Sequence, residues 1–410
     1  MNFQLGTVFL LLLSVAIFTA CSDSNSVDSE LEVPPLYEFT RDGQSAVSFT
    51  GQTTRINMAE EMVSYMKNFD ELNKTRLLEM YRNETADGGD ADPFSSADLN
   101  ATAKNIKSKV AASRDFFFSN TTRSTQIKNQ FEGWLEAQVD EVLPARNQQA
   151  QPGTAGQLPR GSGAEYVNAK GLDYYDMTGK GLIGALMADQ ALNHYLGQAV
   201  LDEGQNRENN DNGITEEGSN FTTMEHMWDE AYGYVYGTTS NVANPNPTLE
   251  DEGSFLGKYL AEVDGMAAFE GTAETVFKAF KRGRAAIVAG RYEIRDEQAN
   301  IIREELSKVI GVRGVYYLQQ AKFLLAQDNP EYGAVFHALS EGYGFIYSLQ
   351  FTRVPNTDSP YFTGKQVDEM LNRLTSDGPD GFWDVTPETL DAISSQIAGG
   401  FRFTVEEAAG

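Results

Sequence analysis

The chain has 410 residues, 41% of them hydrophobic and 11% aromatic, which suits two packed subdomains or one large helical body. Its 59 acidic and 32 basic side chains give a formal net charge of −27. This charge disfavours nucleic acid or an anionic membrane surface as a partner, and it is compatible with cationic ligands.

The first residues resemble the signal of a bacterial lipoprotein. Residues 1–20 contain an apolar run that is too short for a stable transmembrane helix, and they end in Phe18-Thr19-Ala20. Cys21, the only cysteine in the chain, follows directly, as the acylated cysteine does in a lipobox. We therefore expect Cys21 to carry a lipid that anchors the protein to a membrane. The alternative is a conventional cleaved signal with an incidental cysteine.

Residues 21–36 are a polar, acidic tether that cannot bury enough apolar surface to fold. A start rich in Ser and Asp after a lipidated cysteine is similar to the signal that sends some Bacteroidetes lipoproteins to the outer face of the outer membrane. We expect a lipid anchor in the outer membrane, with the cell surface favoured over the periplasmic face. A plain flexible spacer is the alternative interpretation.

The sequence after the tether predicts a largely helical body in three segments. Residues 37–146 hold an N-terminal hairpin and helices, residues 147–252 a linker loop and a first repeat unit, and residues 253–410 a second repeat unit with C-terminal helices. Strand signals are sparse after residue 55. The predicted fold is therefore all-α, with two pseudo-repeated helical bundle units and a short N-terminal β-hairpin-like segment.

Local patterns place the individual elements. Asp42-Gly43, within loosely alternating residues, predicts the turn of the hairpin. Residues 147–180 are rich in Gln, Gly, Pro and Tyr without a sustained period, so we expect a long loop there. Hydrophobic spacing predicts helices over about 71–82, 97–117, 122–144, 180–202, 253–263, 269–290, 295–326, 329–351, 364–375 and 386–398.

One stretch of the chain occurs twice, from His226 to Tyr236 and from His337 to Tyr347. Aligned without a gap, the two copies share five identities: His226/His337, Glu230/Glu341, Tyr232/Tyr343, Gly233/Gly344 and Tyr236/Tyr347. A second shared string precedes each copy, Tyr195-Leu-Gly-Gln-Ala in the first and Tyr317-Leu-Gln-Gln-Ala in the second. These matches indicate an internal repeat.

The His and the Glu of each copy are four residues apart, which places both on one face of a helix, close enough to bond or to share a cation. A carboxylate beside an imidazole fixes its tautomer and raises its basicity, as a metal ligand requires. If the helices meet across a pseudo-two-fold axis, His226, Glu230, His337 and Glu341 converge, with Asp229 adding acidity. Such a ligand set suits iron, zinc or manganese.

The same pairs have a structural interpretation. A buried His bonded to a Glu one turn away is a satisfied polar pair, and Gly233 and Gly344 fit a helix–helix contact where a neighbouring backbone comes close. The repeat by itself leaves both interpretations open. His194, which has no His partner in the second copy, is expected to be structural. The basic run Lys281-Arg-Gly-Arg284 is expected to pair with carboxylates on neighbouring helices.

Several further strings resemble an uncharacterised family of Bacteroidetes lipoproteins of about 400 residues, which is in turn distantly similar to the imelysins. The strings are Pro34-Pro-Leu-Tyr-Glu-Phe, Arg82-Asn-Glu, Gly184-Ala-Leu-Met-Ala-Asp-Gln and Glu225-His-Met-Trp-Asp-Glu-Ala-Tyr-Gly-Tyr. Imelysins are envelope proteins with two helical bundles that are linked to iron or haem uptake. The resemblance therefore implies a similar fold and setting.

The imelysin pattern Gly-x-His-x-x-Glu carries over only in part. His226 matches its His, Asp229 stands where its Glu would be, and Met224 occupies the position of its Gly. The second copy keeps His337 but has Ser340 in the acidic place. The resemblance thus implies a metal role more strongly for the first copy than for the second.

We expect an envelope lipoprotein that binds a metal ion, haem or another ligand, with iron acquisition as its setting and iron, zinc or haem as its cofactor. Its partners would be a membrane through Cys21 and an outer-membrane receptor or other protein, and not nucleic acid. The alternatives are an imelysin-like metallopeptidase and a surface scaffold or adhesin. No His-Glu-x-x-His, Gly-x-Ser-x-Gly or phosphate-binding glycine motif is present, so the sequence does not support an enzyme.

Overall fold

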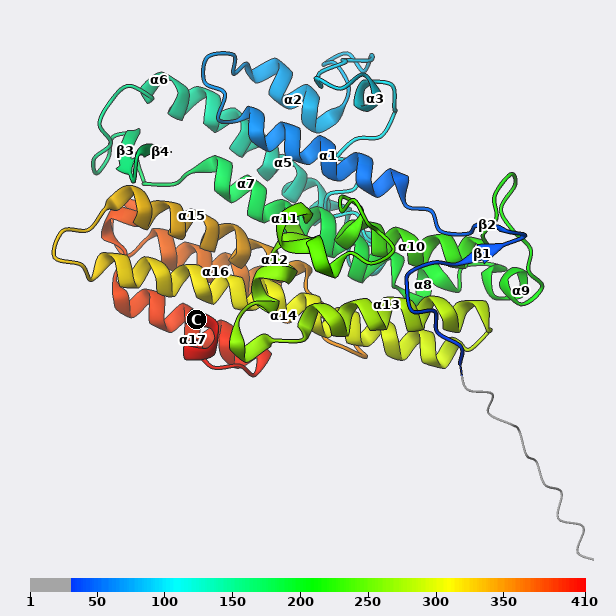
Figure 1. Cartoon of the computed structure of the whole chain (residues 1–410). Coiled ribbons are helices and arrows are strands. Elements are labelled where there is room, and N and C mark those ends of the chain that lie inside the picture. The colour runs from blue at the N-terminus through cyan, green and yellow to red at the C-terminus, as the bar shows by residue number, and fades with distance from the viewer. Residues whose placement is uncertain (1–30) are drawn as a thin grey trace, which may run out of the picture. The chain divides into compact units, whose positions relative to one another are not determined.

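The computed structural model describes residues 31–410, and Val33–Gly410 form one compact unit (Figure 1). The predicted signal peptide, the predicted lipidation site Cys21 and most of the tether lie outside the described residues. Within residues 31–410, no helix combines the length and the apolar character that a membrane span requires.

The predicted N-terminal hairpin is present. β1 (Thr40–Arg41) pairs antiparallel with β2 (Gln44–Ser45). The two turn residues, Asp42 and Gly43, have φ angles of 54° and 75°, as a two-residue hairpin turn of this kind requires. The rest of the unit is helical apart from one further hairpin, so the all-α prediction is confirmed for the described residues.

The N-terminal helices follow the prediction except in one segment. They are α1 (Thr50–Tyr65), α2 (Lys74–Arg82), α3 (Ala97–Asn100), α4 (Arg114–Phe117), α5 (Thr121–Ala137), the π-helical η1 (Gln138–Val142) and α6 (Leu143–Ala145). The helix predicted over 97–117 is wrong, because the backbone between α3 and α4 bonds to other elements instead of to itself. Lys107 N donates to Tyr81 O, and Ala111, at a φ of 46°, donates to Ala185 O.

The expected loop over 147–180 is also wrong in part. It contains β3 (Gly156–Arg160) and β4 (Gly163–Val167), paired antiparallel across a two-residue turn at Gly161 and Ser162. β3 reads Gly-Gln-Leu-Pro-Arg, and glycine and proline hide its strand character. The next helix begins at Tyr174, earlier than predicted.

The middle of the chain combines α-helical and π-helical turns. Its elements are α7 (Tyr174–Leu182), η2 (Ile183–Ala188), η3 (Ala191–Tyr195), α8 (Gln198–Leu201), α9 (Asn206–Asp211) and α10 (Thr223–Tyr236). The stretch η2 to η3 is π-helical, a rare conformation in proteins. A capping box between Thr222 and Glu225 fixes the start of α10.

The predicted C-terminal helices are all present. The elements are η4 (Asn246–Thr248), α11 (Leu249–Glu252), α12 (Phe255–Asp264), η5 (Ala267–Phe269), α13 (Thr272–Val288), α14 (Tyr292–Leu325), α15 (Tyr332–Ser348), η6 (Leu349–Phe351), α16 (Gly364–Thr375), η7 (Gly381–Asp384), α17 (Pro387–Phe401) and α18 (Val405–Ala409). The long helix α14 packs against α13, α15 and α17 (Figure 1).

Two helix pairs that are distant in sequence carry the repeated stretches. α10 packs on α1, and α15 packs on α7. Gly233 and Gly344 lie at these contacts, since a Cβ at Gly233 would come within 2.5 Å of Phe49 Cβ and one at Gly344 within 2.5 Å of Lys180 Cβ. Both glycines therefore permit a close helix approach.

Candidate metal centre

The two repeated His–Glu pairs have the same internal geometry. His226 Nε2 lies 3.8 Å from Glu230 Oε1, and His337 Nε2 lies 3.8 Å from Glu341 Oε2. Neither distance is a direct hydrogen bond. In both copies the Glu takes its close partner from another helix.

That partner comes from a short string that the sequence analysis missed. Gln52 Nε2 of α1 donates to Glu230 Oε1 at 2.7 Å, and Lys180 Nζ of α7 lies 2.8 Å from Glu341 Oε1. Gln52 ends Thr-Gly-Gln and Lys180 ends Thr-Gly-Lys, so the two strings correspond. The shared Thr-Gly is the sequence signal that relates the two strings, but two identical residues are too few to indicate a repeat by themselves.

A tyrosine from the upstream shared string lies beside each His–Glu pair. We call the His, the Glu, the partner of the Glu and this tyrosine a His–Glu frame. Tyr195 OH accepts from Gln52 Nε2 at 3.4 Å and from Lys109 Nζ at 3.3 Å. Burial, together with the charge of Glu341, raises the pKa of Tyr317 far above its ordinary value. The second shared string of the repeat therefore supplies a tyrosine close to the Glu in both copies.

The first copy holds its imidazole near the surface. His226 Nδ1 lies 3.3 Å from Glu216 Oε2, on the loop before α10, and the edge of the ring meets Phe221. The side chains of His226 and Glu216 are 24% and 32% exposed. This contact is a partly solvated pair with little to exclude water.

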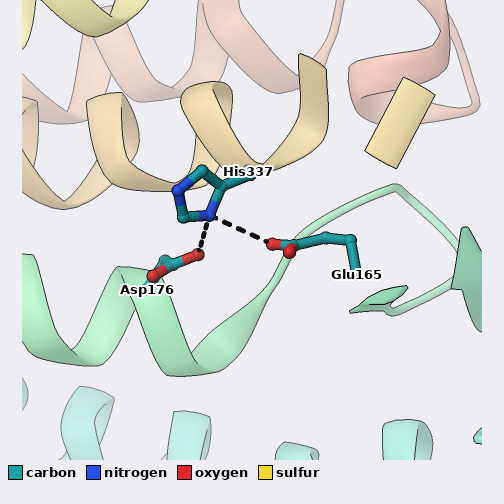
Figure 2. A group of neighbouring side chains, drawn as sticks. All are labelled: Glu165, Asp176 and His337. Atoms are coloured by element: carbon teal, nitrogen blue, oxygen red, sulfur yellow. Dashed lines mark hydrogen bonds and ion pairs between the residues drawn. The ribbon is translucent and has the colours of Figure 1, made fainter. Parts of the chain in front are cut away.

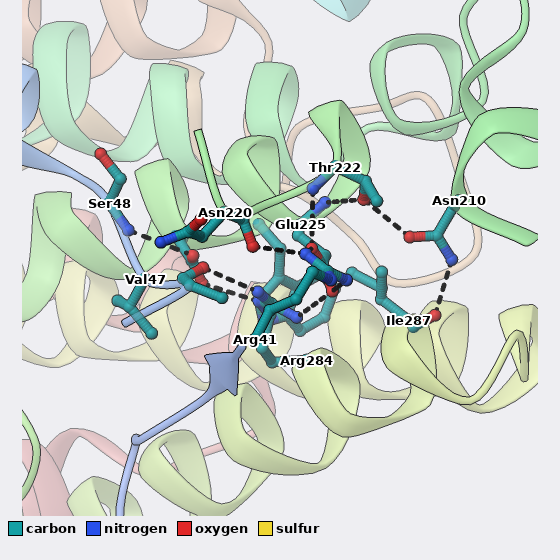
Figure 3. Close-up of polar contacts among 12 residues, drawn as sticks. Arg41, Val47, Ser48, Asn210, Asn220, Thr222, Glu225, Arg284 and Ile287 are labelled. Atoms are coloured by element: carbon teal, nitrogen blue, oxygen red, sulfur yellow. Dashed lines mark hydrogen bonds and ion pairs between the residues drawn. The ribbon is translucent and has the colours of Figure 1, made fainter. Parts of the chain in front are cut away.

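Asp229, the acidic candidate of the first copy, faces a buried arginine. Arg284 Nε donates to Asp229 Oδ1 at 3.0 Å, and Tyr37 OH donates to the same oxygen at 2.6 Å. Arg284 Nη1 also pairs with Glu225 Oε1 at 3.0 Å. Figure 3 shows Arg41 reaching Glu225 from β1, with bonds of 2.8 and 3.0 Å.

This arginine network uses two of the three acidic side chains of α10, Glu225 and Asp229. Burial raises the pKa of Asp229 to about 6, although Arg284 and Tyr37 oppose the rise. Arg284 comes from the basic run that was expected to pair with carboxylates, and that expectation is met. The structure places Asp229 in an ion pair, apart from the cluster of acidic side chains described next.

The second copy gathers three metal-ligating side chains from three elements (Figure 2). His337 Nδ1 of α15 lies 2.7 Å from Asp176 Oδ2 of α7 and 3.4 Å from Glu165 Oε1 of β4. One ligand atom from each residue lies within 4.8 Å of the other two. Within residues 31–410, no other group of three or more His, Cys, Asp or Glu side chains brings its ligand atoms this close together. His226 and Glu230 are not part of the group.

Both carboxylates of this cluster are buried. The side chains of Glu165 and Asp176 are 0% and 1% exposed, and that of His337 is 20% exposed. Burial would lower the pKa of His337, but its hydrogen bonds to Asp176 and Glu165 raise it to about 10. Burial would raise the pKa of Asp176, but the bond from His337 and the charge of Lys180 hold it at about 2.

A third carboxyl group borders the cluster. Asp173 is 1% exposed, and its Oδ2 is buried without a hydrogen-bond partner among the described residues, while the close contact of Glu165 Oε1 is His337 Nδ1 at 3.4 Å. Burial, and then the charges of Glu165 and Asp176, raises the pKa of Asp173 well above its ordinary value. A proton is therefore held where several carboxylate oxygens meet.

One arginine and two lysines flank the same carboxylates, and Arg160 Nη1 lies 3.2 Å from Glu165 Oε2. Lys180 Nζ lies 4.0 Å from Asp176 Oδ1, and Lys67 Nζ lies 3.7 Å from the centre of the Tyr175 ring. Burial would lower the pKa of Lys67, but the charges of Asp173, Asp176 and Glu165 raise it. Protonated side chains and ammonium groups therefore surround the buried carboxylates of the cluster.

An imidazole nitrogen with two carboxylate oxygens can bind zinc, iron or manganese. The sequence analysis had His337 and Glu341 but not Glu165, Asp173 or Asp176. Those three lie in the segment expected to be a loop, on elements whose strand and helix character the sequence conceals.

The third histidine is structural in its geometry. His194 Nδ1 accepts a hydrogen bond from the backbone N–H of Arg114 at 3.1 Å. Burial, and then the charges of Lys109 and Arg114, lowers the pKa of His194 to about 4. A neutral ring that accepts a backbone bond agrees with the role expected from the sequence.

Comparison with protein families gives one match. The model of a family described as a domain of unknown function (DUF4856) matches residues 34–404. No curated protein and no solved structure matches the chain. The match covers all the residues of both His–Glu frames.

Proposed function

The chain belongs to the DUF4856 family, and we propose that it binds a divalent transition metal ion through Glu165, Asp176 and His337. The observation that carries the proposal is the meeting of these three side chains, within 4.8 Å, at a place where both carboxylates are buried. Buried carboxylates at such distances repel one another unless a cation lies among them.

In the metal-free protein a proton takes the place of that cation. The protonated His337 Nδ1 faces both carboxylates, at 2.7 and 3.4 Å. A metal ion would replace this proton, because a ligating imidazole must be neutral. Glu341, near Nε2, would then orient the ring from outside the coordination sphere.

The setting that we propose is the cell envelope. The lipobox-like segment before Cys21 and the polar tether support a lipid anchor in the outer membrane, with the surface favoured. The resemblance to imelysins supports iron as the metal and iron acquisition as the process. The metal site and the anchor rest on different parts of the chain and are tested separately.

The metal site is tested by isothermal titration of the chelator-treated mature protein with Zn²⁺ and with Mn²⁺. We expect one ion per chain, with release of the His337 proton seen as a dependence of the heat on the ionisation enthalpy of the buffer. The double variant Glu165→Gln/Asp176→Asn should bind at least about 100-fold more weakly.

The matched control is His226→Ala/Glu230→Gln, which alters the corresponding pair of the first copy. Its affinity should equal that of the wild type, and circular dichroism should show equal helicity in all three proteins. Wild-type protein that binds neither ion, or a Glu165/Asp176 variant with wild-type affinity, would refute the site. Loss of binding in the control alone would move the site to the first copy.

The anchor is tested by labelling cells with a palmitate analogue. The wild-type chain should incorporate the label and fractionate with the outer membrane, and Cys21→Ser should do neither. A protease added to intact cells should degrade a surface-exposed chain and spare a periplasmic one. Incorporation of label by Cys21→Ser would exclude lipidation at this residue.

A further inference from the structure

A polar cavity of about 660 Å³ is lined by residues outside the metal cluster. Its walls come from α4, α8, α14 and the segment after η6. The side chains that matter to its chemistry are Arg114, Gln198, Asn300, Arg303, Arg353 and Thr357. The volume suits a small organic molecule.

Arg303 is the unusual group in this wall. It is 6% exposed, and its guanidinium donates to Leu192 O at 3.1 Å, to Leu196 O at 2.8 Å and to Asn300 Oδ1 at 3.4 Å. All three acceptors are neutral. Within residues 31–410 no carboxylate lies at ion-pair distance from Arg303, so its buried charge has no direct counter-ion.

The acidic residues of the same wall form ion pairs with arginines other than Arg303. Asp115 and Asp358 pair with Arg353 at 2.7 and 2.6 Å, and Asp296 pairs with Arg295 at 2.7 Å. Arg353 is therefore neutralised by two carboxylates, and its Nε donates to Thr357 O at 2.6 Å, whereas Arg303 has no carboxylate at ion-pair distance among the described residues. Burial, and then the charge of Arg353, lowers the pKa of Arg303 to about 10.

We propose that this cavity binds the carboxylate or phosphate group of a small molecule at Arg303. A planar guanidinium bonds such an oxyanion through two parallel N–H groups, and the anion would supply the charge that Arg303 lacks. Arg114 also lines the cavity, and its Nη1 pairs with Glu203 Oε1 at 3.2 Å. The site is independent of the metal cluster and of its test.

Arg303 also has a structural role, because Leu192 O belongs to η3 and Leu196 O to the residue that ends it. The experiment must therefore separate loss of the anion site from loss of that bond. Ala199, which lines the cavity and is exposed, offers the means. Ala199→Phe fills the cavity and leaves the bonds of Arg303 intact.

The test is titration calorimetry of the mature protein, in a buffer free of phosphate and carboxylates, with inorganic phosphate and separately with succinate. Wild type should bind at least one probe, and the preferred probe identifies the oxyanion. Arg303→Gln and Ala199→Phe should each weaken binding by about tenfold or more. Arg373→Gln, at an exposed position of α16, should leave it unchanged.

Two results would overturn the proposal. One is wild-type protein that binds neither probe at millimolar concentration. The other is an Ala199→Phe variant, folded by circular dichroism, that binds as the wild type does. If Arg303→Gln fails to fold, the Ala199→Phe result decides by itself.

Discussion

The α10 and α15 copies of the repeat share a frame and differ in what surrounds it. Each has a His, a Glu at 3.8 Å and a glycine at a close helix contact. In the first copy the additional acids, Glu225 and Asp229, lie on α10 itself and face Arg284. The corresponding residues of α15 are Phe336 and Ser340.

In the second copy the acids come from β4 and α7 and face His337. The acids of the first copy thus face a buried, permanently charged arginine, whereas those of the second face an imidazolium that can lose its proton, with Arg160 and Lys180 beside it. A metal ion can displace a proton but not a guanidinium held in a buried pair. The difference between the copies therefore separates an ion-paired core from a candidate metal centre.

The largest effect is expected from removing the buried arginine of the first copy. Arg284→Met leaves the buried Asp229 without a cation and Glu225 with Arg41 alone, so it should lower the free energy of unfolding by about 3–5 kcal/mol. Urea denaturation measures this loss. The control is Arg282→Met, an exposed neighbour on α13, which should change stability by less than about 0.5 kcal/mol. Equal stability of the two variants would contradict the network.

The shared helix contact predicts the next largest effect. Gly344→Ala and Gly233→Ala each place a Cβ within 2.5 Å of a side-chain carbon and should cost about 1–3 kcal/mol. Gly399→Ala on α17, where a Cβ meets nothing within 4 Å, should instead stabilise by up to about 1 kcal/mol. Thermal unfolding of the three variants compares them. A neutral Gly344→Ala would show that α15 and α7 can separate without cost.

The histidines predict opposite dependences of stability on pH. The pKa of His337 is raised from 6.5 to about 10, so its stabilising contribution is complete below pH 6.5 and is lost as pH rises through 10. The slope is at most about 1.4 kcal/mol per pH unit. The pKa of His194 is lowered to about 4, so its contribution is present above pH 6.5 and is lost as pH falls through 4.

Imidazole NMR of labelled protein gives both titrations directly, and His337→Gln and His194→Gln assign the signals. A His337 resonance that titrates near pH 6.5 in the metal-free protein would mean that the carboxylates beside it are not charged. Added Zn²⁺ should shift the His337 resonance and leave that of His194 in place.

The smallest effect is expected from exchanging the partners of the two glutamates. Lys180→Gln gives Glu341 the glutamine partner that Glu230 has in the first copy. It also removes a positive charge 4.0 Å from Asp176, so the affinity for zinc should rise about fivefold. Gln52→Lys makes the reverse change beside Glu230 and should create no new binding. Competition with a zinc indicator measures both variants. A lower affinity for Lys180→Gln would mean that Lys180 orders the site and does not compete with the metal.

The internal repeat predicted the His–Glu pair of each copy, but it did not predict the carboxylates that surround His337. His337 and Glu341 could be found because the whole stretch around them recurs. Glu165 and Asp176 could not, since β4 follows a strand that contains glycine and proline, and Asp176 lies in the first turn of a helix that begins earlier than its hydrophobic pattern. Burial was the missing information, because a carboxylate in a polar segment is ordinarily solvated.

Asp229 shows the opposite case. Its position in the imelysin-like pattern favoured a metal ligand, yet Arg284, 55 residues later, neutralises it. The basic run was expected to pair with a carboxylate, but its sequence did not indicate which one. Only the packing of α10 against α13 settles that choice.

The pairing of α1 with α10 and of α7 with α15 has a consequence for synthesis of the chain. Gln52 meets Glu230 across 178 residues, and Asp176 meets His337 across 161. During translation the first member of each pair leaves the ribosome long before its partner, so each contact closes late and α7 stays uncovered by α15 until the chain passes residue 341. Nascent chains shorter than this carry the acidic half of the cluster without its histidine.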